Sequence, residues 1–123
     1  MLDDFHDAAA KADEPRYFGH FAANGVFLGT DATERWDVAA FRAYAHPHFA
    51  KGKAWAMKAS VRFVVVRGDV AWFDEALETE KLGPARGSGV LVREGGAFKI
   101  AQYNLTITIP NGKFGAVKKA LEE

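Results

Sequence analysis

Residues 55–66 read WAMKASVRFVVV, and this stretch decides the fold class because its side chains alternate between two environments. A period of two is typical of a β-strand with one buried face, so a long half-buried strand is expected here. Its apolar face would carry Trp55, Met57, Ala59, Val61, Phe63 and Val65. The opposite face would carry Lys58, Ser60 and Arg62.

More strands are expected after this one, because glycine-containing turns separate the remaining apolar runs. Arg67-Gly68-Asp69 predicts a tight turn into a strand over roughly residues 70–80. A looser return through Gly83-Pro84 leads to a strand around residues 90–92, and Glu94-Gly95-Gly96 turns into a last strand from Ala97 to Ile109. On that strand one face is predicted to hold Phe98, Ile100, Gln102, Asn104, Thr106 and Thr108, and the other Tyr103, Leu105, Ile107 and Ile109.

Three helices are expected before this region. Leu2, Phe5, Ala9 and Ala12 recur at helical spacing in the first. Asp13 can cap a second helix that carries Tyr17, Phe18 and Phe21 and ends near Asn24-Gly25, before a short strand over residues 26–28. Asp37 can cap a third helix, which Pro47 is expected to end or bend. Helices first and an antiparallel meander last predict an α+β fold.

Composition narrows the class of protein. The chain has 123 residues and is predicted to form a single domain, residues 1–123. Its 16 basic residues balance 16 acidic residues, so no field attracts nucleic acid or an anionic membrane, and neither partner is expected. The absence of cysteine excludes disulfides and thiolate metal sites. The acidic start and the lack of a long apolar run predict a soluble, cytoplasmic protein.

Three stretches carry a resemblance to a known family: FAANGVFLGTD (21–31), GDVAWFD (68–74) and GGAFKIAQYNLT (95–106). Together with the element order, they resemble the SnoaL-like domain of the nuclear transport factor 2-like superfamily. The resemblance implies a cone in which a strongly curved mixed, mostly antiparallel sheet wraps three N-terminal helices, as in a cystatin-like roll, around a cavity. It also implies dimers through the outer sheet face, and chemistry without a cofactor where members are enzymes.

The resemblance argues against the steroid isomerase mechanism. Aligned with that enzyme class, its base would fall at Gly29 and its proton-donating acid near Gly89, and neither residue has an ionisable side chain. Many family members carry alternating histidines on the last strand, where this chain has Gln102 and Asn104. Amides bind ligands but do not transfer protons at neutral pH.

Several polar residues on the strands are candidates for a site. Gln102 and Asn104 share the strand face that the family pattern places toward the helices, where they would orient a ligand or bond to loop backbone or to each other. Asp74 shares a face with Trp72 and is a candidate general acid or base, or else a paired surface carboxylate. Glu75 points to the opposite face and competes for that role.

The helices supply further candidates. Tyr17, Trp36 and Trp55, together with Trp72 of the sheet, would complete an aromatic ligand site, with Trp36 either covering the pocket mouth or packing on Phe41. His20 is a candidate catalytic base if it faces the cavity, or else a half-exposed helical residue. His46-Pro47-His48 suggests a metal pair, but Pro47 breaks helical spacing and no acidic cluster adjoins it, so no metal site is predicted.

Two function classes follow. The first is a pocket protein that binds a small apolar ligand and isomerises, dehydrates or cyclises it, with Asp74 or His20 as the proton-transfer residue. The second is a non-catalytic association module. In both, we expect a homodimer that buries an outer sheet face with residues such as Val64, Val66, Tyr103, Leu105 and Ile107.

Overall fold

The computed structural model describes residues 1–52 and 54–123, and in these residues helices precede and cover a six-stranded sheet. The N-terminal part contains α1 (Leu2–Ala10), α2 (Glu14–Phe18), β1 (Phe21–Leu28), β2 (Arg35–Asp37) and α3 (Val38–Ala50). The C-terminal part contains β3 (Met57–Arg67), β4 (Val70–Thr79), β5 (Gly83–Glu94), β6 (Ala97–Ile107), the 3₁₀ turn η1 (Asn111–Lys113) and α4 (Phe114–Leu121).

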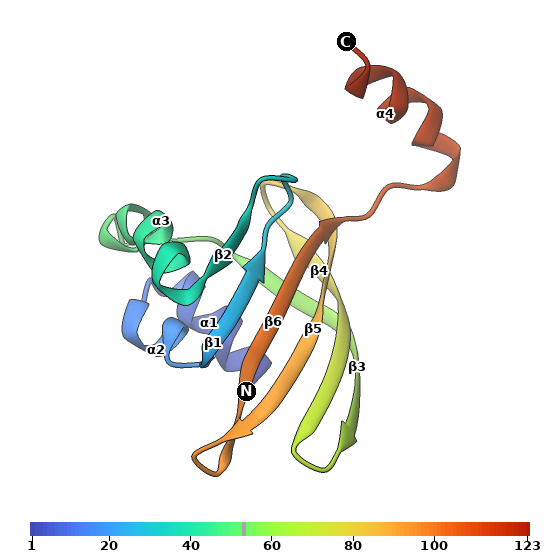
Figure 1. Cartoon of the computed structure of the whole chain (residues 1–123). Coiled ribbons are helices and arrows are strands. Elements are labelled where there is room, and N and C mark those ends of the chain that lie inside the picture. The colour runs from blue at the N-terminus through green and yellow to red at the C-terminus, as the bar shows by residue number, and fades with distance from the viewer. Residues whose placement is uncertain (53) are drawn as a thin grey trace.

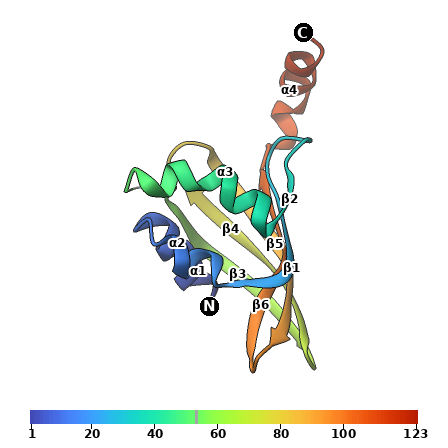
Figure 2. The same ribbon diagram turned by 60° about the vertical axis from the view of Figure 1, so that its left-hand side comes forward.

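The strands form one mixed sheet in the order β2-β1-β6-β5-β4-β3. All neighbouring strands are antiparallel except β1 and β6, which are parallel. Figures 1 and 2 show a strongly bent sheet with α1, α2 and α3 on one side and α4 standing away from the rest at the end of β6. This α+β arrangement confirms the predicted fold class.

Capping residues read from the sequence begin two of the helices. The Asp13 carboxylate accepts a hydrogen bond from the Arg16 backbone N–H at the start of α2. The Asp37 carboxylate accepts one from the Ala40 N–H at the start of α3. Pro47 lies within α3, which continues to Ala50, so of the two predicted outcomes, an end or a bend, Pro47 does not end this helix.

Strand β1 begins earlier than predicted. The second helix ends at Phe18, not near Asn24-Gly25, and Phe21 is already paired with Ile100 of β6. The Ile100 N–H donates to the His20 carbonyl at 2.8 Å, so pairing with β6 replaces the next helical turn. A Cβ on Gly25 would lie 2.7 Å from the Ile100 carbonyl oxygen, and glycine therefore permits this close approach of the two strands.

A β-bulge at Ser60 reverses the faces predicted for β3. The β3–β4 register pairs Ala59 with Leu77 and then Val61 with Ala76, which leaves Ser60 as the extra residue. One extra residue moves every later side chain to the other face. Met57 and Ala59 therefore face the helices, but Val61, Phe63 and Val65 face outward.

A second bulge, at Ala101, reverses the predicted faces in the later part of β6. Leu91 pairs with Ile100 but Val90 pairs with Gln102, so Ala101 is the extra residue. Phe98 and Ile100 lie on the helix side as predicted, whereas beyond the bulge Tyr103 and Leu105 are buried and Gln102 is exposed. The prediction that Gln102, Asn104 and Thr106 share the inner face with Ile100 is wrong for this reason.

The core lies between the helices and the concave face of the sheet. It is rich in aromatic rings: Phe5 stacks on Tyr17 at 4.3 Å between ring centroids, and Phe41 of α3 stacks on Phe27 of β1 at 4.1 Å. Within residues 1–52 and 54–123, no helix is long and apolar enough to cross a membrane.

Candidate functional site

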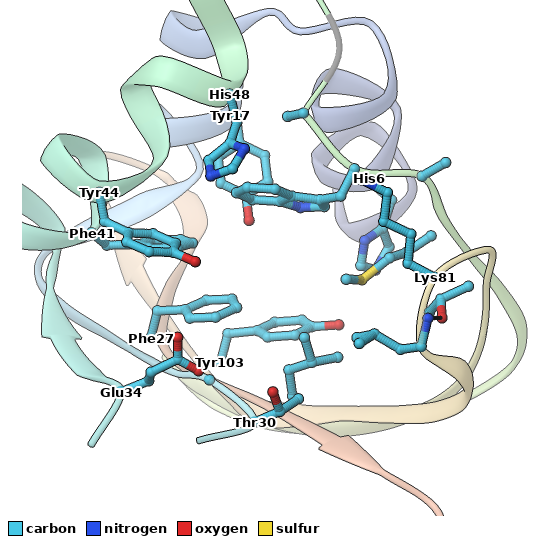
Figure 3. Close-up of a pocket in the computed structure, with 18 of the residues that line it drawn as sticks. His6, Tyr17, Phe27, Thr30, Glu34, Phe41, Tyr44, His48, Lys81 and Tyr103 are labelled. Atoms are coloured by element: carbon cyan, nitrogen blue, oxygen red, sulfur yellow. Dashed lines mark hydrogen bonds between the residues drawn. The ribbon is translucent and has the colours of Figure 1, made fainter. Parts of the chain in front are cut away.

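A cavity of about 390 Å³ lies between the three N-terminal helices and the sheet (Figure 3). Such a volume is within the range of small-ligand sites, at its lower end. Its walls are mainly aromatic, with Phe5, Tyr17, Phe27, Phe41, Trp36, Trp55 and Tyr103 among the lining residues. The rim is more polar and includes the exposed residues Thr30, Tyr44, His48 and Lys81.

The aromatic rings of one wall are nearly parallel. Phe27 and Tyr103 have centroids 5.6 Å apart and planes 4° apart. Phe41 lies 13° from the plane of Phe27, and Trp36 lies 14° from the plane of Phe41 with centroids 5.4 Å apart. The predicted packing of Trp36 on Phe41 is therefore present, and the same indole lines the cavity. Flat walls of this kind favour a planar ligand.

A buried cluster of polar side chains lies at the inner end of the cavity. The Glu75 side chain is 0% exposed, and its Oε2 lies 2.7 Å from His6 Nε2. The Tyr103 hydroxyl donates to the same oxygen at 2.6 Å. Arg62 Nε donates to Oε1 at 2.7 Å, so every oxygen of this carboxylate is bound.

Arg62 supplies the charge that a buried carboxylate needs. Its Nη2 lies 2.7 Å from Glu75 Oε1 and 3.0 Å from Asp3 Oδ1, and Asp3 is itself largely exposed. Burial raises the pKa of Glu75, but the hydrogen bonds and charge of His6, with the hydrogen bonds of Tyr103 and Arg62, outweigh it and lower the pKa overall. Glu75 is therefore an ionised acceptor at neutral pH.

Glu75 helps to keep the neighbouring Tyr103 hydroxyl protonated. Burial, followed by the charge of Glu75, raises the pKa of Tyr103, so its phenol keeps its proton and donates it to the carboxylate. Strand β5 passes beneath this contact at Gly87, where a Cβ would meet the Tyr103 hydroxyl and lie 2.9 Å from Glu75 Oε2. The missing side chain leaves the space that the cluster occupies.

A second hydroxyl belongs to Tyr17 of α2. Figure 3 shows its oxygen on the cavity side. Burial raises the pKa of Tyr17 strongly, and a hydrogen bond with Trp55 lowers it by less. Tyr17 therefore remains a neutral hydroxyl in the cavity.

Three of the six predicted ligand-binding residues line the cavity: Tyr17, Trp36 and Trp55. The other three are on the outer face. Trp72 is 46% exposed, and it pairs with Val65 and Val90 on the convex side. Gln102 pairs with Val90 and Asn104 with Ser88 on that same side, because the bulge at Ala101 turned them outward.

Neither predicted catalytic residue reaches the cavity. Asp74 is exposed on the outer face, next to Phe63 and Ser88 in the sheet. His20 binds Asp4, with Nε2 2.7 Å from Oδ2, and is not a lining residue. The hydrogen bond from Arg16, followed by that from His20, holds the pKa of Asp4 well below its usual range. The contact between Arg16 and Asp4 also joins α2 to α1.

The histidines of the His46-Pro47-His48 segment point to different neighbours. His46 Nδ1 lies 2.7 Å from Glu14 Oε1, whereas His48 lies at the cavity rim near Trp55. Among residues 1–52 and 54–123, no group of three or more metal-ligating side chains is assembled.

Sequence reasoning missed His6 and Tyr103 as site residues and left Glu75 undecided. One signal was available: Glu75 falls in phase with the apolar residues Ala71, Phe73 and Leu77 of β4. A charged residue in the buried phase of a strand needs partners. His6 is also four residues after the buried Leu2 and three before the buried Ala9, which places it on the apolar face of α1.

The chain matches one protein family and several solved structures. A family model described as a SnoaL-like domain matches residues 1–110. No curated protein matches the chain. A nuclear transport factor 2-like protein of unknown function from Pseudomonas putida KT2440 has a TM-score of 0.73 at 13% identity, covering 89% of this chain and 83% of that chain.

Two further solved structures are similar. A protein of unknown function from Mycobacterium tuberculosis has a TM-score of 0.74 at 19% identity and covers 91% of this chain and 70% of that chain. A candidate ketosteroid isomerase from Shewanella frigidimarina has a TM-score of 0.65 at 17% identity, covering 85% and 90%. At these identities the likeness establishes the fold, a nuclear transport factor 2-like roll.

Proposed function

Because this chain belongs to the SnoaL-like domain family, we propose that its cavity binds a small, largely apolar molecule with a planar ring system. The observation that carries the proposal is the cavity of about 390 Å³ with parallel aromatic walls and a polar cluster at one end. Apolar walls with a few convergent polar groups are typical of small-molecule sites.

The size of the cavity limits the ligand. At about 30 Å³ for each water, 390 Å³ corresponds to roughly 13 waters, or a ligand of on the order of a dozen non-hydrogen atoms if it is fully enclosed. A larger molecule would extend past the rim, where Glu34 and Lys81 offer charges of both signs.

The reaction class that fits this fold and cavity is isomerisation, dehydration or cyclisation without a cofactor. Each of these reactions requires a proton to be removed or delivered beside the ligand. One structural neighbour carries the name of a candidate ketosteroid isomerase, which supports this class. Gly29 and Gly89, however, provide no counterpart to the acid–base pair of a steroid isomerase.

A ligand screen with two matched variants tests the proposed pocket. Hydroxylated aromatic, terpenoid and steroid-like compounds would be tested by thermal shift and then by calorimetry. Trp36→Ala removes a wall of the cavity and should weaken binding of a stabilising compound about tenfold, since a buried aromatic contact contributes roughly 0.5–1.5 kcal/mol beyond its area. Trp72→Ala removes an indole of the outer face and should leave affinity unchanged.

The proposal fails if no compound stabilises the protein. It also fails if the two tryptophan variants weaken binding equally, because the ligand would then not occupy the cavity that Trp36 lines.

A second function, association of two copies, is supported by the convex face of the sheet. Val61, Phe63, Val65 and Trp72 lie together there and are exposed. The residues predicted for this face need correction: Tyr103 and Leu105 are buried inside, and Val64 and Val66 pair with Phe73 and Ala71 on the concave side. We propose that the corrected patch, not the predicted one, forms a homodimer.

A further inference from the structure

With a neutral His6, the two polar residues that line the inner end of the cavity, His6 and Tyr103, offer acceptors and not donors to a ligand. Glu75 is ionised, and an ionised carboxylate can only accept hydrogen bonds. The Tyr103 hydroxyl therefore gives its proton to Glu75, and the hydrogen bond at His6 Nε2 must be an N–H donated to the same oxygen. With a neutral imidazole, what remains for a ligand is the lone pair on His6 Nδ1 and those on the Tyr103 oxygen.

Glu75 contacts a permanent cation, Arg62, as well as His6. Glu75 already has a permanent counter-ion, because Arg62 contacts its other oxygen at 2.7 Å. Asp3 also approaches Arg62, but its carboxylate is 84% exposed and is screened by solvent.

The His6 ring borders the cavity. Its side chain is 6% exposed and lines the cavity, while Nε2 is held by Glu75. Figure 3 shows the ring at the edge of the same space that Tyr103 and Phe27 border. Among the described residues no hydrogen-bond partner of Nδ1 is found.

We propose that His6 is the acid–base group of this cavity and that the ligand is a planar aromatic or enolic molecule with a weakly acidic hydroxyl. The inference rests on the proposed pocket function. The ligand O–H bond breaks, its electron pair stays on the oxygen, and the proton forms an N–H bond at His6 Nδ1. The product is an imidazolium between Glu75 and the ligand anion, with no net gain or loss of protons.

Glu75 is the positioning residue in this scheme. It fixes the orientation of His6 through Nε2 and stabilises the imidazolium as it forms, because the two charges lie at 2.7 Å in a buried environment. Flat rings on the walls admit a planar molecule, and the acceptor lone pairs at the inner end select a hydroxyl that can donate.

A coloured phenol tests the proposal directly. The ionised form of 4-nitrophenol absorbs at longer wavelength than the neutral form, so absorbance reports proton transfer and calorimetry reports binding. 4-Nitroanisole, which has a methyl group in place of the acidic proton, is the matched compound. With the wild-type protein, bound 4-nitrophenol should show the phenolate band at a pH where the free compound is mostly neutral.

Three variants separate the roles. His6→Gln should abolish the phenolate band and weaken 4-nitrophenol binding roughly ten- to a hundredfold, the size of a lost charge-assisted hydrogen bond. It should leave 4-nitroanisole binding within about twofold, the control that the variant still folds. Glu75→Gln should reduce the band, and His46→Gln, at a histidine that contacts Glu14 and does not line the cavity, should leave it unchanged.

Nitrogen-15 NMR of the wild-type protein gives a second test that requires no variant. His6 should have a protonated Nε2 and an unprotonated Nδ1 when free, and two protonated nitrogens with 4-nitrophenol bound. A protonated Nδ1 in the free protein would overturn the proposal, as would equal binding of the phenol and its ether with no phenolate band. Equal binding of the two compounds would still leave the proposed pocket function intact. Failure of both compounds to bind would contradict the pocket function and the role of His6 together.

Discussion

Glu75 shows how one residue can link stability and function in a small domain. Its carboxylate joins α1, β3 and β6 through His6, Arg62 and Tyr103, and none of its oxygens is free for a ligand. The residue therefore acts through its neighbours. It holds the histidine that meets the cavity, and the arginine beside it allows a negative charge to be buried there.

The effect of Glu75 on stability is predicted to depend on pH. Its pKa is lowered on folding from an ordinary value of 4.5, so its charge stabilises the fold above that pH, and this contribution is lost as the pH falls through the folded value. Glu75→Gln should lower the free energy of unfolding by about 3–5 kcal/mol at neutral pH, because it leaves Arg62 without its buried partner.

Urea unfolding at a series of pH values measures this. The difference between wild type and Glu75→Gln should shrink as the pH falls below about 4.5. Glu78→Gln on the exposed face of the same strand is the control and should change stability by less than about 0.5 kcal/mol. A difference that stays constant across the acid range would contradict the assignment of an ionised Glu75.

At the scale of elements, most of the fold could be predicted and most of the site could not. Periodicity located β3, β4 and β6, and Asp13 and Asp37 marked two helix starts. The site depended on which way side chains face, and a period-two pattern cannot reveal where a bulge reverses its phase. Bulges at Ser60 and Ala101 therefore exchanged the inner and outer residues of two strands.

The Ala101 bulge has one signal in the sequence, a glycine close to it on the neighbouring strand. Gly89 of β5 pairs with Tyr103, and a Cβ at this position would meet the backbone carbonyl of Gln102. Backbone cannot move aside as a side chain can. The period-two pattern of β6 showed no break at Ala101, so it placed Gln102 and Asn104 on the same inner face as Ile100.

Gly89→Ala is predicted to disturb this part of the sheet. It should lower the free energy of unfolding by about 1–3 kcal/mol, the cost of overpacking, because β5 and β6 must separate. Gly112→Ala has no atom within 4 Å of the added Cβ and should change stability by less than about 0.5 kcal/mol. Denaturant unfolding compares the two, and equal effects would show that strand contact at Gly89 does not limit the sheet.

For the whole molecule, the cavity and the proposed dimer surface lie on opposite faces of one sheet. The helices cover the concave face of the sheet (Figures 1 and 2) and enclose the ligand space with it. Phe63 and Trp72 are exposed on the convex face. Ligand binding and association can therefore be tested separately, since a side chain on either face of β3 or β4 contacts only one of the two environments.

The convex patch has the features of a surface that binds a copy of itself. Phe63 is 65% exposed and its neighbours Val61, Val65 and Trp72 are apolar, which is costly to leave in water. Outward-facing Asp74 and Arg86 add one charge of each sign beside this patch. An interface related by a twofold axis uses the same surface twice, so such a patch can pair the acid of one copy with the base of the other.

Sedimentation of two variants that differ by one position tests this surface. Phe63→Lys places a charge in the centre of the patch and should weaken dimerisation roughly thirtyfold or more, as expected for a central aromatic residue in an interface. Val64→Lys adds the same charge to the next residue, which is 47% exposed on the concave side, and should leave the dimer intact. A wild-type monomer at micromolar concentration, or equal effects of the two lysines, would contradict association through the convex face, because only the direction of the side chain distinguishes these two positions.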